Sequence, residues 1–191
     1  MESKVFELSS LMQASYLFAL YDDEEKLETM KKMLKNQPSA VSLIASVFER
    51  LKREDDKHTM YTLMSVLWLA FKLNDGEMPT LPHKHVDHSF AAHFKRTNYY
   101  NDTPHADGKE PDRLDLLAED YPRRDVMEFV ELWMSEKPED HDDPEKLKEA
   151  RLSSEVVFSV MKVIMDAYIV NQANPIVADD APASEAVDDK E

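Results

Sequence analysis

The sequence contains no cysteine and only two glycines, Gly76 and Gly108, among its 191 residues. Without cysteine, disulfides, thiol nucleophiles and cysteine-ligated zinc are excluded, and a reducing interior fits the composition better than export does. Tight hairpins and phosphate-binding loops rely on glycine for positive φ and close backbone approach. The scarcity of glycine therefore argues against Rossmann, P-loop and barrel enzymes and favours a helical protein.

Long apolar runs and clusters of basic residues are also missing. No apolar stretch approaches the roughly 20 residues of a membrane span, and the amino-terminal segment lacks the pattern of a signal peptide. The chain carries 39 acidic and 23 basic residues, a formal charge of −16, which opposes contact with phosphate groups. We therefore expect a cytoplasmic protein that binds neither nucleic acid nor membranes directly and whose acidity favours a basic protein partner.

Apolar residues recur at intervals of three and four along much of the chain, which is the pattern of amphipathic helices. This spacing predicts helices over residues 3–21, 22–37, 39–53, 55–74, 122–136 and 144–172. Residues 60–71 and 156–168 are apolar around most of the helix circumference, so we expect them at the centre of a bundle. In the first helix the spacing places Leu8, Leu11, Met12, Ser15 and Ala19 on one helical face, which we expect to be buried, with Phe18 beside them.

Residues suited to capping stand at several expected helix ends. Asp22 and Glu25 have the spacing of a capping box, and Asp143 is followed by a proline, as an N-cap residue often is. Ser39 is expected to cap the third helix, and Gly76 suits the end of the fourth. These residues predict where the connections between helices lie.

The sequence predicts an all-α bundle of five or six principal helices, formed by one domain over residues 1–174. Residues 77–111 interrupt the helical pattern with four prolines and five of the seven histidines, which predicts an irregular His- and Pro-rich insert with one short helix over 86–95. Residues 175–191 carry six acids and one lysine with few large apolar residues. This composition predicts a disordered acidic tail.

Three histidines and an aspartate crowd the insert in the run PHKHVDH, namely His83, His85, Asp87 and His88. The pattern H-x-H-x-D-H resembles the signature of the metallo-β-lactamase superfamily, in which these residues ligate a dinuclear zinc centre that activates water. That family places the motif after a buried strand in a glycine-rich sandwich, which this chain lacks, so only the ligand types carry over. A helical backbone after Pro82 would place His85 and His88 on one face, with His83 approaching from the first turn. These three histidines are therefore candidate metal ligands, with Asp87 as a further one.

Arg53 and His58 form an R-x4-H pattern. The pattern resembles the active-site motif of helical ribonucleases of the HEPN class, which implies a nuclease site at these two positions. Glu54 follows the arginine here, where that family usually has asparagine or aspartate, so the match extends to two residues alone.

The run SEKPEDHDD contains Glu136, Pro138, Asp140 and His141. It is similar to the E-P-x-D-H signature of the TorD- and NarJ-like chaperones that attend molybdoenzyme maturation, which implies a chaperone role. Lys137 intervenes between the glutamate and the proline, and charged residues follow where that family has an apolar helix.

These observations favour a non-catalytic cytoplasmic protein–protein interaction module, such as an adaptor, regulator, immunity protein or chaperone. It would act through a helical groove or through the insert, and it would need no cofactor. The alternative is a metal-dependent enzyme or metal-binding protein that holds zinc or another divalent metal at His83, His85 and His88. Stoichiometric metal in untagged protein would distinguish the second hypothesis from the first.

Overall fold

The computed structural model describes residues 8–51, 53–76, 78–102, 124–133 and 143–173, and these residues form helices without any strand. The all-α fold class is therefore confirmed. The extent of the domain stays a prediction, and the acidic tail lies outside the described residues. The elements are α1 (Leu8–Leu20), α2 (Asp23–Asn36), α3 (Pro38–Val47), η2 (Phe48–Arg50), α4 (Glu54–Asp75), α5 (His83–Asp102), α7 (Arg124–Trp133) and α8 (Pro144–Ala173).

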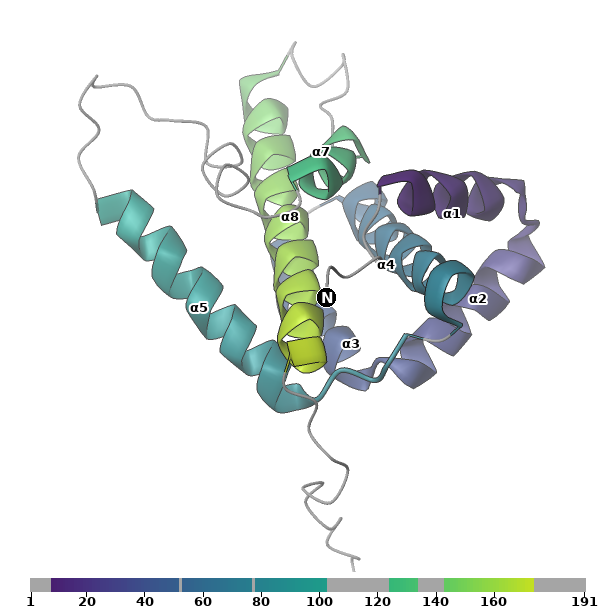
Figure 1. The fold of residues 1–191 in the computed structure, drawn as a ribbon. Coiled ribbons are helices and arrows are strands. Elements are labelled where there is room, and N and C mark those ends of the chain that lie inside the picture. The colour runs from purple at the N-terminus through teal and green to yellow at the C-terminus, as the bar shows by residue number, and fades with distance from the viewer. Residues whose placement is uncertain (1–7, 52, 77, 103–123, 134–142, 174–191) are drawn as a thin grey trace, which may run out of the picture.

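Two helices, α4 and α8, organise the molecule (Figure 1). α1 and α2 pack against α4, whereas α5 and α7 pack against α8. α3 contacts both α5 and α8, and α7 also reaches α1. α1 and α2 thus lie on the opposite side of the molecule from α5, and α7 lies beside α1.

The two segments expected at the centre of the bundle supply much of the apolar core, and the other helices pack around them. Phe71 of α4 and Phe158 of α8 are almost completely buried. The ring of Phe71 meets the ring of Tyr168 edge to face, with centroids 4.3 Å apart. Further core residues from these two helices are Met60, Leu63, Met64, Leu67, Val157, Met161 and Ile164. The central position expected for residues 60–71 and 156–168 is confirmed.

Several expected helix ends are also confirmed. The Glu25 backbone N–H donates to Asp22 Oδ1 at 2.8 Å, and the Asp22 N–H donates to Glu25 Oε2 at 3.0 Å, which completes the capping box. Asp143 Oδ1 accepts from the Glu145 N–H at 3.0 Å at the start of α8. Gly76 ends α4 with a φ of +87°, in the region that favours glycine.

Loss of the capping box is expected to cost a modest and measurable amount of stability. Asp22→Ala leaves the Glu25 N–H without its carboxylate acceptor, and we expect a loss of about 1 kcal/mol in the free energy of unfolding. Asp22→Asn should retain most of the stability because its amide oxygen accepts the same bond. Urea denaturation of both variants measures the difference, and equal losses would show that the bond is not the cause.

The expected cap at Ser39 is wrong, because α3 begins at Pro38 with Gln37 in the N-cap position, so Ser39 lies inside the helix. The Gln37 side chain makes no cap bond and is fully buried. Its Nε2 donates to the Pro79 carbonyl at 3.0 Å, and its Oε1 accepts from the Leu81 N–H at 3.1 Å. Gln37 therefore fastens the segment before α5 to the junction of α2 and α3.

The irregular insert is corrected by the structure, because residues 83–102 form the helix α5, about twice as long as the short helix expected within the insert. α5 forms its most extensive contact with α8. Its buried face carries His85, Val86, Ser89 and His93, of which three are polar. A polar buried face hides the apolar spacing from which helices are predicted. Residues 103–111 of the expected insert lie outside the described residues.

Candidate interaction surface

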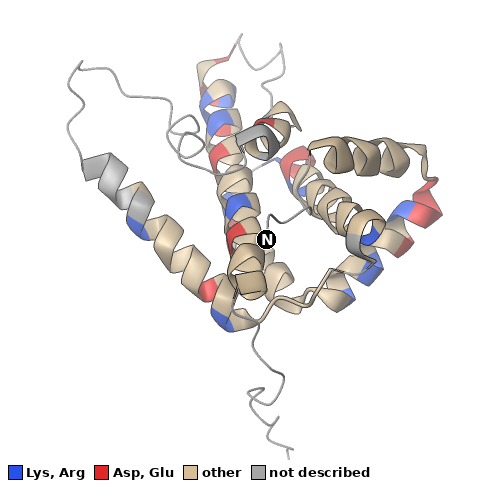
Figure 2. Ribbon diagram, in the orientation of Figure 1, with Lys and Arg blue, Asp and Glu red and all other residues tan. Residues whose placement is uncertain are grey.

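Helix α1 has no acidic, basic or histidine residue anywhere along LSSLMQASYLFAL, although 32% of the chain is charged. Its inner face buries Leu11, Ala14 and Phe18. Figure 2 shows α1 without a charged residue, whereas α2 and α8 carry many. The outer face of α1 therefore has to be formed by neutral side chains.

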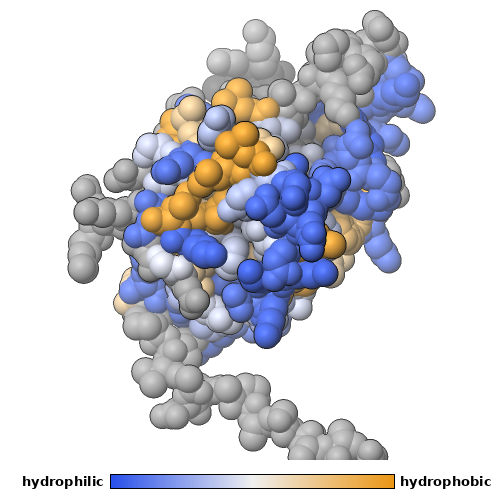
Figure 3. All heavy atoms as spheres, turned by 90° about the vertical axis from the view of Figure 1, so that its right-hand side faces the viewer, coloured by the Kyte–Doolittle hydropathy of each residue, from blue (hydrophilic) through white to orange (hydrophobic). Residues whose placement is uncertain are grey.

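Three large neutral side chains do form this outer face. Met12, Tyr16 and Leu20 have exposed fractions of 58%, 66% and 64%. With half-buried Leu8 they recur every four residues, so they lie along one side of the helix over about 18 Å. We call these four residues the α1 stripe. Figure 3, which faces the side formed by α1 and α2, shows a hydrophobic band next to a hydrophilic one.

A groove continues the α1 stripe at its amino-terminal end. It lies between α1 and α7, has a volume of about 540 Å³, and is lined by Leu8, Met12, Glu128, Phe129, Leu132 and Trp133. Leu132 is the most exposed large apolar residue described, at 74%. Phe129 is buried beneath the groove and contacts Trp133, with ring centroids 6.2 Å apart. The groove is thus an apolar trough on a well-packed floor.

Carboxylates bracket the apolar surface at both ends. Glu128 lines the groove beside Leu8 and Met12. At the other end, the run Asp22, Asp23, Glu24, Glu25 follows the stripe after one residue, and all four side chains are exposed. The capping box engages the first and last of these, which leaves Asp23 and Glu24 in the first turn of α2. The surface thus combines an apolar centre with acidic ends.

The face of α1 that the sequence predicted as buried is wrong in part. Leu11 and the neighbouring Phe18 are buried as expected, but Met12 and Ala19 are exposed, and Ala14, which the spacing did not assign to this face, is buried. α1 is apolar on two sides, so spacing alone cannot decide which side packs on α4. The sequence feature that indicates the surface is the absence of charged residues from residues 8–20. A helix without charge on any side is expected to pack against other groups on its outer face as well as on its inner face.

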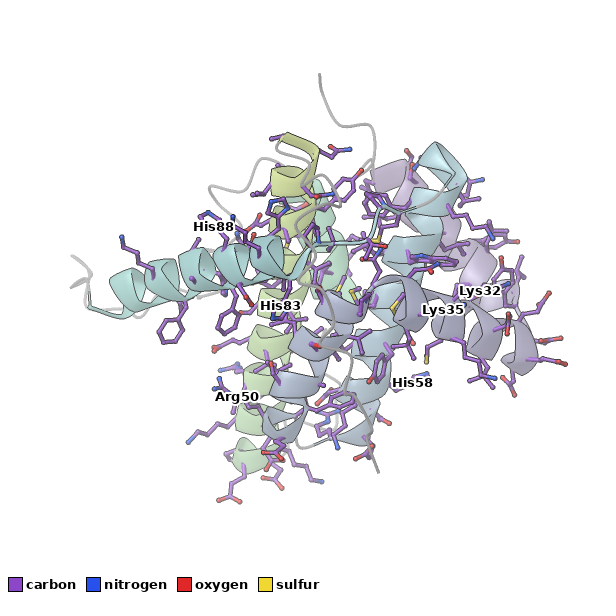
Figure 4. All side chains as sticks on the ribbon, turned by 90° about the horizontal axis from the view of Figure 1, so that it is seen from below. Lys32, Lys35, Arg50, His58, His83 and His88 are labelled. Carbon is purple, nitrogen blue, oxygen red and sulfur yellow. The ribbon has the colours of Figure 1, made fainter. Side chains whose placement is uncertain are left out.

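The candidate metal ligands lie at the start of α5. His83 and His88 are exposed, and Figure 4 shows them on different sides of the helix. His85 is buried, with an exposed fraction of 7%. The His83 Nε2 lies 3.6 Å from Asp87 Oδ2. The helical backbone therefore spreads the three imidazoles around α5.

Within the described residues, no group of three or more histidine and acidic side chains is arranged to hold a metal ion. The structure therefore does not bring His83, His85 and His88 together. Metal binding by these residues in solution stays a prediction. Given this geometry, we expect any binding to use the exposed His83 with Asp87 and to leave His85 uninvolved.

The two residues of the R-x4-H pattern lie at the start of α4. Arg53 is the N-cap residue with an extended backbone, and its Nε lies 3.6 Å from Asp56 Oδ2. His58 is exposed on the helix, as Figure 4 shows. The arginine is thus engaged with an acidic neighbour one turn into the helix. Residues 136–141, which carry the chaperone-like pattern, lie outside the described residues.

A scan against protein-family models, a search of curated proteins and a search of solved structures gave no significant match to this chain. In the part of the chain that the structure describes, no helix combines the length and apolar composition that crossing a membrane requires. The functional assignment therefore rests on the geometry of the surface formed by α1 and α7.

Proposed function

We propose that this chain is a non-catalytic protein–protein interaction module, placed in the cytoplasm, that binds its partner through the α1 stripe and the adjoining α7 groove. The observation that carries the proposal is the exposure of Met12, Tyr16 and Leu20 on a helix that has no charge. Contiguous apolar surface of this kind on a folded protein marks interaction sites.

The chemistry of the surface supports binding energy of a useful size. Moving one large apolar side chain from water into an interface contributes up to about 1.5–3 kcal/mol before the costs of association. Tyr16, Met12 and Trp133 belong to the residue types that are enriched at interface centres. A micromolar complex needs about 8 kcal/mol after the costs of association have been met, so several of these residues would have to be buried together.

The proposal is tested by partner recovery from an extract of the native host. The double variant Met12→Ser and Tyr16→Ser removes apolar surface without adding charge, and both positions are exposed, so the fold should persist. We expect the protein that co-purifies stoichiometrically with the wild-type chain to fall at least about tenfold, since each lost contact contributes more than 1 kcal/mol. Quantitative mass spectrometry measures the ratio.

The matched control is Phe90→Ser with Phe94→Ser on α5. These two residues are also exposed, at 45% and 59%, and α5 lies on the other side of the molecule from α1 (Figure 1). The control should leave recovery unchanged. Loss of the partner in the α5 variant with full recovery in the α1 variant would move the binding site to α5 and reject the proposal.

A further inference from the structure

The acidic ends of the α1 stripe restrict which molecule can cover it. An apolar stripe of about 18 Å on a helix fits the apolar face of another helix of about 12 residues, which packs by interleaving side chains three and four positions apart. Glu128 at one end and Asp22 to Glu25 at the other would then lie beside the two ends of that helix.

A second copy of this chain does not fit. In an antiparallel pair of α1 helices, the Asp22–Glu25 run of each copy would lie near Glu128 of the other. In a parallel pair, the two Asp22–Glu25 runs would lie side by side. Both arrangements bring carboxylates together, and each copy carries a formal charge of −16, so like-charge repulsion opposes self-association through this surface.

The acidic carboxyl-terminal segment of the chain does not fit either. Residues 175–191 carry six acids and one lysine, which gives a net charge of −5. The same repulsion at both ends of the α1 stripe opposes its docking there. The charge pattern favours an occupant with cationic groups at the ends of an apolar face.

We infer that the occupant is an amphipathic α-helix of another protein, with apolar residues at intervals of three and four and with lysine or arginine at both ends of that apolar face. The inference rests on the proposed function and specifies its partner. Glu128 receives one basic end, and Asp23 and Glu24 receive the other. The apolar face supplies most of the affinity, and the charges set the orientation and the rate of association.

Two synthetic peptides of 16 residues test this partner class against the full chain. Both carry the same leucine face at helical spacing, and one has lysines at the ends where the other has glutamates. Fluorescence anisotropy should show at least about tenfold tighter binding of the lysine peptide at low salt. The ratio should shrink as salt rises to about 1 M, where the screening length falls from about 10 Å at 0.1 M to about 3 Å.

Variants of the protein locate the binding. Met12→Ser with Tyr16→Ser should weaken the lysine peptide at least tenfold, and the α5 control variant Phe90→Ser with Phe94→Ser should leave it unchanged. Asp23→Asn with Glu24→Gln should lower the preference for lysine over glutamate. Asp87→Asn with Glu49→Gln removes the same charge from exposed positions on α5 and η2 and should preserve more of that preference.

The outcomes separate this inference from the proposed function. Equal affinity for both peptides, lost in the Met12 and Tyr16 variant, would overturn the basic partner and leave the α1 surface as a binding site. Peptide affinity that is unchanged in the Met12 and Tyr16 variant would overturn both the inference and the proposed function. Failure of both peptides to bind would overturn the inference and point to another occupant. A dimer in sedimentation that the Met12 and Tyr16 variant converts to monomer would also overturn it and would identify a second copy of the chain as the occupant.

Discussion

Replacing Phe71 with alanine is expected to lower the free energy of unfolding by about 3–5 kcal/mol, the usual cost of deleting a buried phenylalanine ring. Phe71 is completely buried near the carboxyl-terminal end of α4, and its ring packs on Tyr168 of α8. The deletion removes apolar burial, leaves a cavity and breaks the ring contact between the two central helices. Small domains have only about 5–15 kcal/mol in total, so urea denaturation should show a large shift of the midpoint.

Phe94→Ala is the matched control for this prediction. It deletes the same ring from a residue of α5 that is 59% exposed. Surface substitutions usually change stability by no more than about 0.5 kcal/mol, so the two variants should differ several-fold in their effect. A similar loss from both would contradict the position of Phe71 at the contact of α4 with α8.

Replacing Gln37 with leucine is expected to cost about 2–4 kcal/mol, although the two side chains have similar volumes. The amide of Gln37 is the partner of the Leu81 N–H and of the carbonyls of Pro79 and Met78. Leucine would leave these backbone groups buried without a partner, and each such group costs about 1–3 kcal/mol. The segment that leads into α5 should loosen as a result.

Two measurements check the Gln37 prediction. Urea denaturation gives the global loss, and hydrogen exchange should show faster exchange at the Leu81 amide. Gln13→Leu is the matched control, because Gln13 is exposed on α1 and should change stability by no more than about 0.5 kcal/mol. Unchanged exchange at Leu81 in the Gln37 variant would show that the buried amide does not hold this segment.

The central helices could be predicted from the sequence because their apolar residues cover most of the helix circumference. Most of the buried residues of α4 and α8 are apolar, so the spacing of apolar residues carries the information directly. The cap residues Asp22, Asp143 and Gly76 were also predictable, since each satisfies a local requirement of its own helix end. Such capping preferences depend on neighbouring residues and not on tertiary packing, so they can be predicted from the local sequence.

The helix α5 could not be predicted in full because its buried face is polar. His85, Ser89 and His93 face the interior, and the packing against α8 that buries them depends on residues about 70 positions away in the chain. The role of Gln37 could not be predicted for a similar reason. The sequence indicated Ser39 as the N-cap of α3, whereas Gln37 occupies that position. Its buried amide has partners more than 40 residues further along the chain.

The sequence predicted only part of the candidate surface. A helical groove was among the expected modes of binding, but the spacing of the histidines indicated a metal site at residues that the helical backbone spreads apart. Met12 was assigned to the buried face because α1 has apolar residues on two sides. Which side meets α4 is decided by packing with other helices, and the spacing of residues within α1 carries no such information.

Hydrogen exchange of the full chain, alone and bound to the protein recovered with it, tests the interaction surface most directly. We expect slower exchange on partner binding in Leu8–Leu20 of α1 and Arg124–Trp133 of α7, with little change in α5. Exchange in α1 and α7 that stays the same on binding, with protection confined to α5, would contradict an interaction through the α1 stripe.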